Sequence, residues 1–312
     1  MKKALLTLFA AAVCLSSAAQ MKISGTVKDS AGKPVAGVVV SDGFSCANTD
    51  AKGRYKLAAS KDAFYVFYSI PAEYGIATKD GHPDFYKKIE KGVKKYDFTL
   101  APLEGGVEKE FKLVMVADPQ AQCDFHVKRF ERETVPDIRA YVDAQSVPCY
   151  GVTLGDMAYS EGKANAVPLM PKMRRAMGYD RSHLLFFQTM GNHDNAFAPV
   201  ATDERSSNIN LAYQRPFEEV FGPVNYSWNR GDVHIVSMKD IEYLLAEKSN
   251  KYRPAFPTAY FSAAPFQGFS SSNFMLSAIL VSLMLLINTR TCCPTVNTFL
   301  GFSTLPHDIS EI

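Results

Sequence analysis

The sequence lacks an excess of charge of either sign. It has 34 Lys and Arg residues against 32 Asp and Glu residues, a formal net charge of +2. Lys2 and Lys3 lie in a segment that we expect to be cleaved, and without them the net charge is zero. Because long Lys/Arg runs are also absent, the sequence argues against general nucleic-acid binding. Internal repeats and heptads are missing too, which excludes repeat arrays and coiled coils.

Cysteine is scarce as well, with six in 312 residues. Outside the cleaved segment five remain, namely Cys46, Cys123, Cys149, Cys292 and Cys293. An odd number spread this widely is not a disulfide framework, and the adjacent pair near the end lacks the C-x-x-C spacing of a zinc site. The chain does have 47% hydrophobic residues, enough to bury the cores of about two domains.

Residues 1–20 are typical of a signal peptide. Two lysines are followed by an apolar run over residues 4–15 and by small residues at positions 16–19. Cys14 suggests a lipoprotein, but Val13 stands where a lipidation site requires Gly, Ala or Ser. From the signal-peptide pattern we expect export to a periplasm or beyond, where disulfides are permitted. A buried N-terminal helix is the alternative interpretation of these residues.

Residues 21–103 are typical of short strands separated by turns. The string G-T-V-K-D-S-A-G-K-P-V-A-G-V-V-V, over residues 25–40, is followed by T-D-A-K-G-R-Y-K-L over residues 49–57. This pattern predicts a small β-sandwich and resembles the carboxypeptidase regulatory-like, prealbumin-type domain. The acidic turn residues could bind calcium, although turn formation alone explains them.

The pattern changes after residues 103–106, a plausible linker. Apolar runs at residues 111–117, 150–154, 184–190 and 233–238 predict strands. Residues 125–142, interrupted by Pro136, and residues 170–177 and 211–220 predict helices. Buried strands that alternate with helices predict a parallel or mixed sheet covered by helices, hence an α/β domain over residues 108–252.

Polar residues follow each of the first three predicted strands of this domain. The clusters are Asp118-Pro119-Gln120, Gly155-Asp156 and Gly191-Asn192-His193-Asp194. Because ligands bind at the carboxyl ends of strands in open α/β sheets, we expect the three clusters to converge. Carboxylate, amide oxygen and imidazole suit Fe, Mn or Zn better than a thiolate site would.

The order D-P-Q, G-D, G-N-H-D resembles the calcineurin-like metallophosphoesterase family. The stretch over residues 213–223 and the following Tyr226-Ser227-Trp228 fit the same family. With the strand-rich region in front, the arrangement is similar to exported phosphoesterases of Bacteroides-type bacteria. The resemblance implies a four-layer α/β/β/α domain, incomplete here, behind the β-sandwich. It also implies hydrolysis of a phosphoester by a hydroxide that bridges two divalent metal ions of the Fe, Mn or Zn type.

The resemblance also implies roles for the clustered residues. Asp118 and Gln120 would hold the first metal, although the family more often has His at the second position. Asp156 would bridge both metals, and Asn192 would bind the second.

One further residue would act on the substrate, and another would orient its side chain. His193 would stabilise charge on the phosphoryl group or protonate the leaving oxygen, and Asp194 would orient its ring.

The family pattern continues with three further His ligands, which this chain does not supply. After Asp194 it contains only His234 and His307, and no Gly-His pair. We expect His234 to be structural, and His126 and His183 to be surface or capping residues. The activity of this chain is therefore expected to be impaired; a non-catalytic cell-envelope binding protein with a vestigial phosphoesterase domain is the alternative.

The tail over residues 253–312 is atypical. There is no charged residue between Arg253 and Arg290, and residues 274–287 are almost entirely apolar. Fourteen residues fall short of the roughly 20 that span a bilayer, so we expect no stable span, and weak membrane anchoring is an alternative. Our preferred hypothesis is a reading-frame change near residues 248–257, which would leave the sheet short of strands.

Overall fold

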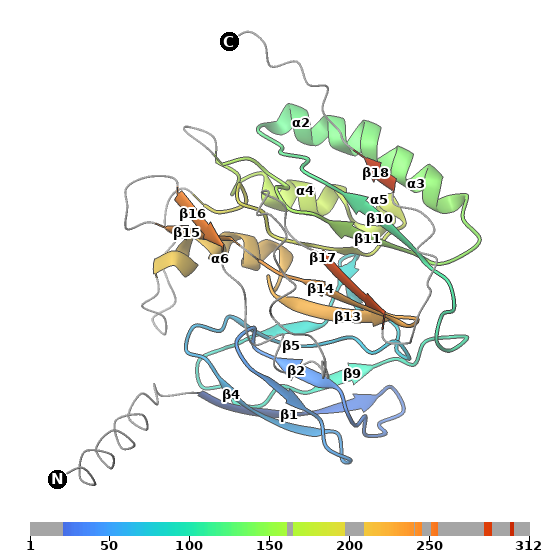
Figure 1. Ribbon diagram of the computed structural model, residues 1–312, viewed down its shortest axis with the longest axis vertical. Helices are drawn as coiled ribbons and strands as arrows, with labels where there is room; N and C mark the ends of the chain where they lie inside the picture. The colour runs from blue at the N-terminus through green and yellow to red at the C-terminus, as the bar shows by residue number, and fades with distance from the viewer. Residues whose placement is uncertain are drawn as a thin grey trace, which may run out of the picture.

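The computed structural model describes residues 21–160, 165–196, 209–239, 241–244, 251–254, 284–288 and 300–302. Strands from the N-terminal part of the chain lie at the bottom of Figure 1, and a region of helices and parallel strands lies at the top. The predicted signal peptide over residues 1–20 and most of the tail lie outside the described residues.

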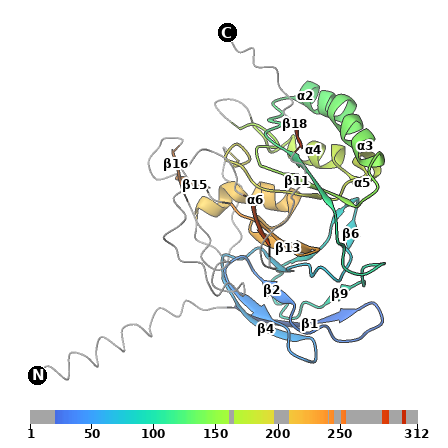
Figure 2. The same ribbon diagram turned by 45° about the vertical axis from the view of Figure 1, so that its right-hand side comes forward.

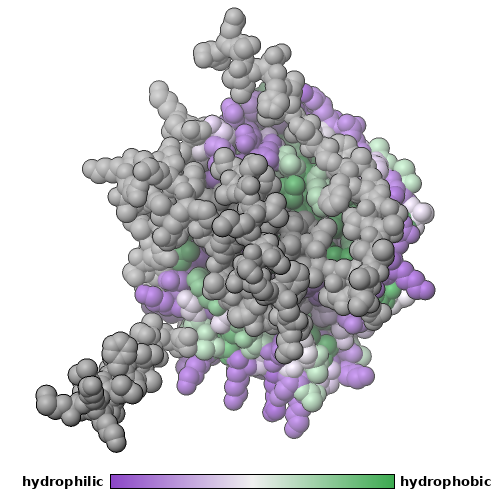
Figure 3. Space-filling model, viewed as in Figure 1, coloured by the Kyte–Doolittle hydropathy of each residue, from purple (hydrophilic) through white to green (hydrophobic). Residues whose placement is uncertain are grey.

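Two sheets form the N-terminal region. The first has the order β4-β1-β9 and the second the order β3-β2-β5-β8, beside a small hairpin of β6 and β7. The strands are β1 (Met21–Asp29), β2 (Val39–Ser41), β3 (Cys46–Asn48), β4 (Arg54–Ala59), β5 (Tyr65–Tyr68), β6 (Thr78–Lys79), β7 (His82–Pro83), β8 (Tyr86–Lys88) and β9 (Phe98–Leu100). Strand β4 alternates between exposed and buried side chains, and Figure 3 shows hydrophilic residues along this lower edge of the molecule.

The acidic turn residues of this region act on the backbone, as the sequence predicts for turns. Asp29 Oδ1 accepts hydrogen bonds from the backbone N–H groups of Ala31 and Lys33, at 3.0 and 2.8 Å. Asp50 Oδ1 accepts from the N–H groups of Lys52 and Arg54, both at 2.9 Å. Each carboxylate thus closes its own turn.

A parallel sheet carries the three polar clusters. Its order is β12-β11-β10-β18, and all of its pairs are parallel, which confirms the predicted pairing mode. The strands are β10 (Lys112–Val116), β11 (Cys149–Thr153), β12 (Phe186–Phe187) and β18 (Leu300–Phe302). Strand β12 is much shorter than predicted. Since β10, β11 and β12 run in the same direction, the loops that follow them all lie at the carboxyl-terminal end of the sheet.

Several helices pack beside this parallel sheet (Figures 1 and 2). They are α2 (Asp124–Arg129), the π-helix η1 (Phe130–Thr134), α3 (Val135–Asp143), α4 (Met170–Ala176) and α5 (Tyr179–Ser182). The predicted helix over 125–142 is therefore interrupted, and Pro136 lies in the first turn of α3. Because proline has no backbone N–H, the regular hydrogen-bond ladder is broken there, and the wider π turn precedes it.

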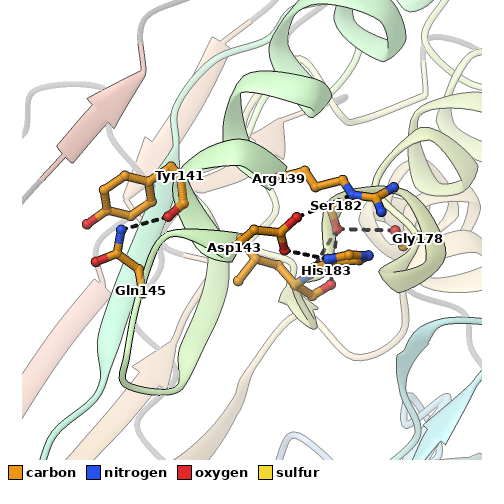
Figure 4. A network of polar contacts seen from close by, with 8 residues as sticks. Arg139, Tyr141, Asp143, Gln145, Gly178, Ser182 and His183 are labelled. Carbon is orange, nitrogen blue, oxygen red and sulfur yellow. Dashed lines mark hydrogen bonds and ion pairs between the residues drawn. The ribbon is translucent and has the colours of Figure 1, made fainter.

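A polar contact joins α3 to α5 (Figure 4). Asp143 Oδ1, at the end of α3, lies 2.6 Å from Nδ1 of His183, and Arg139 approaches the other carboxylate oxygen at 3.6 Å. His183 follows α5 directly and has φ of 57°. The prediction that His183 is a surface or capping residue is confirmed, since His183 is the C-terminal cap of α5.

A second sheet lies between the parallel sheet and the N-terminal strands in both ribbon views. It is antiparallel, with the order β13-β14-β17, and consists of β13 (Tyr226–Arg230), β14 (Val233–Ser237) and β17 (Met284–Asn288). Helix α6 (Ile209–Phe221) precedes it, and β15 (Ile241–Leu244) pairs with β16 (Lys251–Pro254). The four-layer order that the resemblance implies stays a prediction.

The tail supplies strands that the sequence did not predict. Strand β17 pairs with β14, and β18 pairs with the outer edge of β10, so the expected loss of strands at these two edges is wrong. Part of the apolar run over 274–287 is thus a strand, and its remainder lies outside the described residues. Among the described helices, none combines the length and apolarity needed to cross a membrane.

One hydrophobic core joins the N-terminal strands to the second sheet. It extends from Ile23 on β1 to Ile235 on β14 and includes Trp228, which is 1% exposed. The Trp228 ring stacks on Phe187 with centroids 3.9 Å apart, and its backbone bridges to Ile70. A separate core lies between the parallel sheet and its helices. The two predicted regions therefore share a continuous apolar junction.

Candidate metal centre

The first two loops contain a strained backbone at the predicted ligands. Asp118, Gln120 and Asp156 have φ of 46°, 43° and 51°. Only five non-glycine residues in the described chain have positive φ, so three of the five gather here. Left-handed backbone is unfavourable for side chains other than glycine, and it is maintained where the surrounding structure requires it, often at functional sites.

Asp156 lies at the centre of the three loops. Its backbone carbonyl accepts from the N–H of Gln120 at 2.8 Å, and its Oδ2 lies 3.4 Å from Gln120 Nε2. Its Oδ1 accepts from the backbone N–H of His193 at 2.8 Å. The loops after β10 and β11 and the Gly-Asn-His-Asp loop therefore meet at this one carboxylate, as the strand ends predicted.

Gly191 allows the third loop to approach this closely. A Cβ atom at position 191 would lie 2.1 Å from Asp156 Oδ1 and 2.4 Å from the Asp156 backbone nitrogen. Real Cβ atoms do not tolerate such contacts, so a side chain here would push the loops apart. The glycine is thus needed for close approach of the backbone.

Asp194 differs from its predicted role. It is fully buried, its Oδ1 accepts from the N–H of Ala158 at 3.2 Å, and its Oδ2 accepts from the N–H of Gly191 at 3.0 Å. The carboxylate therefore ties the second loop to the third. The predicted contact with the His193 ring is wrong: His193 Nδ1 lies 3.2 Å from the carbonyl oxygen of Ser160.

The site brings three carboxyl groups together, and those of Asp156 and Asp194 are buried. Burial raises the pKa of Asp156, and the nearby carboxylate of Asp118 adds to the effect. Burial also raises the pKa of Asp194, with a further contribution from Asp156. Carboxylates that are difficult to ionise together are stabilised by a cation, so the electrostatics favour binding of a positive ion.

The donors match a divalent cation in kind but not in number. Asp118, Gln120, Asp156 and Asn192 offer oxygen atoms, which hard and intermediate metal ions accept. Within the residues the structure describes, however, no three His, Cys, Asp or Glu side chains are grouped to hold a metal. In the third loop, the backbone carbonyl of Asn192 accepts from Asn195 Nδ2 at 3.0 Å. The described part therefore supplies an incomplete shell.

Two further histidines of the described chain, His234 and His126, make their contacts elsewhere. Nδ1 of His234, on β14, lies 2.7 Å from Asn229 Oδ1, and burial lowers the pKa of this histidine. This contact fits the predicted structural role. Nδ1 of His126, on α2, accepts from the N–H of Gln122 at 3.3 Å, so it caps a local turn. His307 lies outside the described residues.

The sequence did not indicate two residues around His193. The Tyr159 ring stacks on the imidazole with centroids 4.3 Å apart and an interplanar angle of 25°. The Ser160 carbonyl faces the ring nitrogen, while its hydroxyl accepts from the N–H of Ala166 at 2.8 Å. The only available signal was an aromatic residue shortly after Gly-Asp, which does not by itself specify a contact.

Comparison with known proteins gives one positive result. A family model described as N terminal of Calcineurin-like phosphoesterase matches residues 21–103. No curated protein matches the chain. The matched segment is the strand-rich region, whose likeness to a prealbumin-type domain stays a prediction, and it precedes the three loops described above. The match therefore supports a relationship to calcineurin-like phosphoesterases from a part of the chain that does not contain the candidate metal centre.

Proposed function

We propose that the chain is a metal-dependent hydrolase of phosphoester bonds by ancestry, with activity reduced by missing His ligands. The observation that carries this proposal is the left-handed backbone of Asp118, Gln120 and Asp156, which follow neighbouring strands of a parallel sheet. Gln120 and Asp156 are also joined by hydrogen bonds. Strain of this kind costs about 1–3 kcal/mol per residue, so its concentration at one site favours a functional origin.

Each loop has its own part in the proposed site. Asp118 and Gln120 would hold one divalent ion, of the Fe, Mn or Zn type, and Asn192 would hold a second. Asp156 would serve both, since it already contacts the other two loops. Such ions, when bound, acidify water and offset charge on phosphate oxygens. The carboxylate of Asp194 keeps the loops in register by binding backbone N–H groups on two of them.

His193 would act on the phosphoester itself. Its backbone N–H is held by Asp156, and its half-buried ring lies at the edge of the site. From there the imidazole can donate a hydrogen bond to a phosphoryl oxygen or a proton to the departing alkoxide. We place this reaction outside the cytoplasm, because residues 1–20 have the order of a signal peptide.

A non-catalytic role is the second candidate. The incomplete donor set among the described residues favours it, since a half shell binds metal weakly and leaves most positions to water. In this case the chain would be an exported binding protein of the cell envelope that retains the loops without the reaction.

Metal titration of the full chain tests the proposal. We expect Mn²⁺ or Zn²⁺ to raise the melting temperature of the protein and to support slow hydrolysis of a chromogenic phosphodiester. Both effects should be lost in Asp156→Asn. The matched control is Asp124→Asn, which changes an exposed carboxylate on α2 that pairs with Lys172.

Three results are informative. Metal-dependent stabilisation and hydrolysis that Asp156→Asn abolishes support the enzyme. Stabilisation without hydrolysis supports the binding protein. Equal stabilisation of wild type, Asp156→Asn and Asp124→Asn contradicts a metal centre at these loops.

A further inference from the structure

We propose that Tyr159 and the carbonyl of Ser160 are positioning elements for the imidazole of His193. Together they fix both the plane of the ring and the nitrogen that it presents to substrate. This inference rests on the proposed function for its purpose, but the geometry that it describes can be measured without any reaction.

The Ser160 carbonyl determines the tautomer of His193. Nδ1 of the ring lies 3.2 Å from this oxygen. A carbonyl oxygen can only accept a hydrogen bond, so the proton must be on Nδ1. Nε2 is then the nitrogen that faces the substrate. It donates to a phosphoryl oxygen or a leaving group when the ring carries its second proton, as the imidazolium.

The Tyr159 ring determines the plane of the imidazole. The two rings are stacked at 4.3 Å between centroids with an interplanar angle of 25°. Such a face contact restricts rotation about the terminal torsion of histidine, which is otherwise broad. The hydrogen bond fixes one edge of the ring and the stack fixes its face, so only one orientation satisfies both.

Tyr159 and Ser160 are themselves held in place. The backbone N–H of Tyr159 donates to the carbonyl of Ala121 at 3.0 Å, which ties it to the loop after β10. Ser160 is 2% exposed, and its hydroxyl accepts from Ala166 N–H at 2.8 Å. Tyr159 and Ser160 therefore lie on the same loop as Asp156. They directly follow Ala158, whose backbone N–H donates to Asp194.

Asp194 is excluded from this role by its own contacts. Both of its oxygens accept backbone N–H groups, at Ala158 and Gly191. The family resemblance implies that a carboxylate orients the histidine, whereas here a backbone carbonyl and an aromatic ring contact the imidazole. This difference can be tested directly.

Nuclear magnetic resonance of the histidine rings in the full chain measures the geometry. The signal of His193 is assigned by its loss in His193→Gln. In the wild type we expect the Nδ1-protonated tautomer and ring protons shifted upfield by the tyrosine face. If the wild-type protein shows the Nε2-protonated tautomer, or no upfield shift, the proposal is overturned.

Two substitutions separate the ring from the hydroxyl. Tyr159→Leu should abolish the upfield shift and allow tautomers to mix, whereas Tyr159→Phe should retain both features. The matched control is Tyr179→Leu, which removes an exposed tyrosine beside another histidine, His183, with centroids 6.0 Å apart. It should leave the signal of His193 unchanged. A His193 signal that is the same in wild type, Tyr159→Leu and Tyr159→Phe contradicts the positioning role.

Kinetics connect the geometry to the reaction. If the chain hydrolyses a chromogenic phosphodiester with Mn²⁺, Tyr159→Leu should lower kcat about tenfold with little change in KM, and Tyr159→Phe should restore it. If no hydrolysis occurs, the proposed enzyme function fails, while the spectra of the rings still decide the positioning role.

Discussion

At the scale of single residues, Gly191 leaves no room for a side chain beside Asp156. We predict that Gly191→Ala lowers the free energy of unfolding by about 1–3 kcal/mol, because the added Cβ meets backbone and carboxylate atoms that cannot retreat. It should also remove any stabilisation by Mn²⁺. Urea denaturation with and without metal measures both effects.

The control for this substitution is Gly75→Ala. A Cβ at Gly75 would meet its nearest neighbour, the Ala101 carbonyl oxygen, at an ordinary 3.6 Å. We expect it to change stability by less than about 0.5 kcal/mol. Equal effects of the two substitutions would show that close approach at Gly191 is not required.

His82 gives the protein a predictable sensitivity to acid. It is 3% exposed, and its Nδ1 is buried with no hydrogen-bond partner. Burial lowers the pKa of His82 from 6.5 to about 4; the Arg174 charge adds to this effect, and Asp80 opposes it. The unfolded chain therefore binds a proton more readily, and stability should fall by up to about 3 kcal/mol as pH drops from 6.5 to 4.

Denaturation at a series of pH values measures this slope. His82→Gln removes the titrating group and should flatten the dependence on pH, whatever it does to stability at neutral pH. The same change at the half-buried His126 should leave the slope as it is. If His82→Gln and the wild type show parallel pH profiles, the buried imidazole is not responsible.

At the scale of elements, α6 contains a buried ion pair whose arginine also contacts the N-terminal region. Arg215 and Glu218 are 5% and 6% exposed and contact each other, and Arg215 Nη2 donates to the Asp62 carbonyl at 2.7 Å. We predict that Arg215→Met costs about 3–5 kcal/mol, because it leaves Glu218 buried without its partner. The double variant Arg215→Met/Glu218→Leu should recover much of this loss.

An exposed pair of the same type serves as the control. Arg129 on α2 and Glu133 on η1 are four positions apart, and Arg129 Nη2 lies 2.7 Å from Glu133 Oε2 at the surface. Arg129→Met should have little effect, since exposed pairs contribute little. Chemical denaturation of the three variants decides the point, and a double variant less stable than Arg215→Met would contradict our account.

Some elements and contacts could be predicted from the sequence, and others could not. Apolar runs predicted β10 and β11 within about a residue, because a strand buried on both faces must be continuously apolar. The convergence of Asp118, Gln120 and Asp156 also followed from strand ends. The partners of Asp194 did not, since they are backbone groups brought close only by the folded loops. The pairing of β17 and β18 was equally invisible, because their partners lie far away in the sequence.

At the scale of the whole molecule, the N-terminal strands and the second sheet should unfold together. Arg230 on β13 is fully buried; it donates to the Tyr74 carbonyl at 3.1 Å and lies 4.0 Å from the Glu108 carboxylate of the connecting segment. Trp228 is the single tryptophan and packs in the core that both regions share. Its fluorescence therefore reports on the junction itself.

We predict that tryptophan fluorescence and far-ultraviolet circular dichroism give coincident urea transitions. Glu108→Gln should shift both to lower urea, because the buried Arg230 loses its countercharge. Glu110→Gln, at an exposed position in the same segment, should not. Fluorescence that changes well before the dichroism would show that the junction opens while the two regions stay folded.

The strand order has a consequence for biosynthesis. Strand β10 begins at Lys112, yet one of its edges waits for Leu300–Phe302, and β14 waits for Met284–Asn288. During synthesis these apolar edges stay open while most of the chain is still being made. Until these partners are made, bare backbone at the two edges can pair with other chains, so we expect chaperones that cover exposed strands to favour correct folding. A chain that stops before residue 284 would keep both edges open.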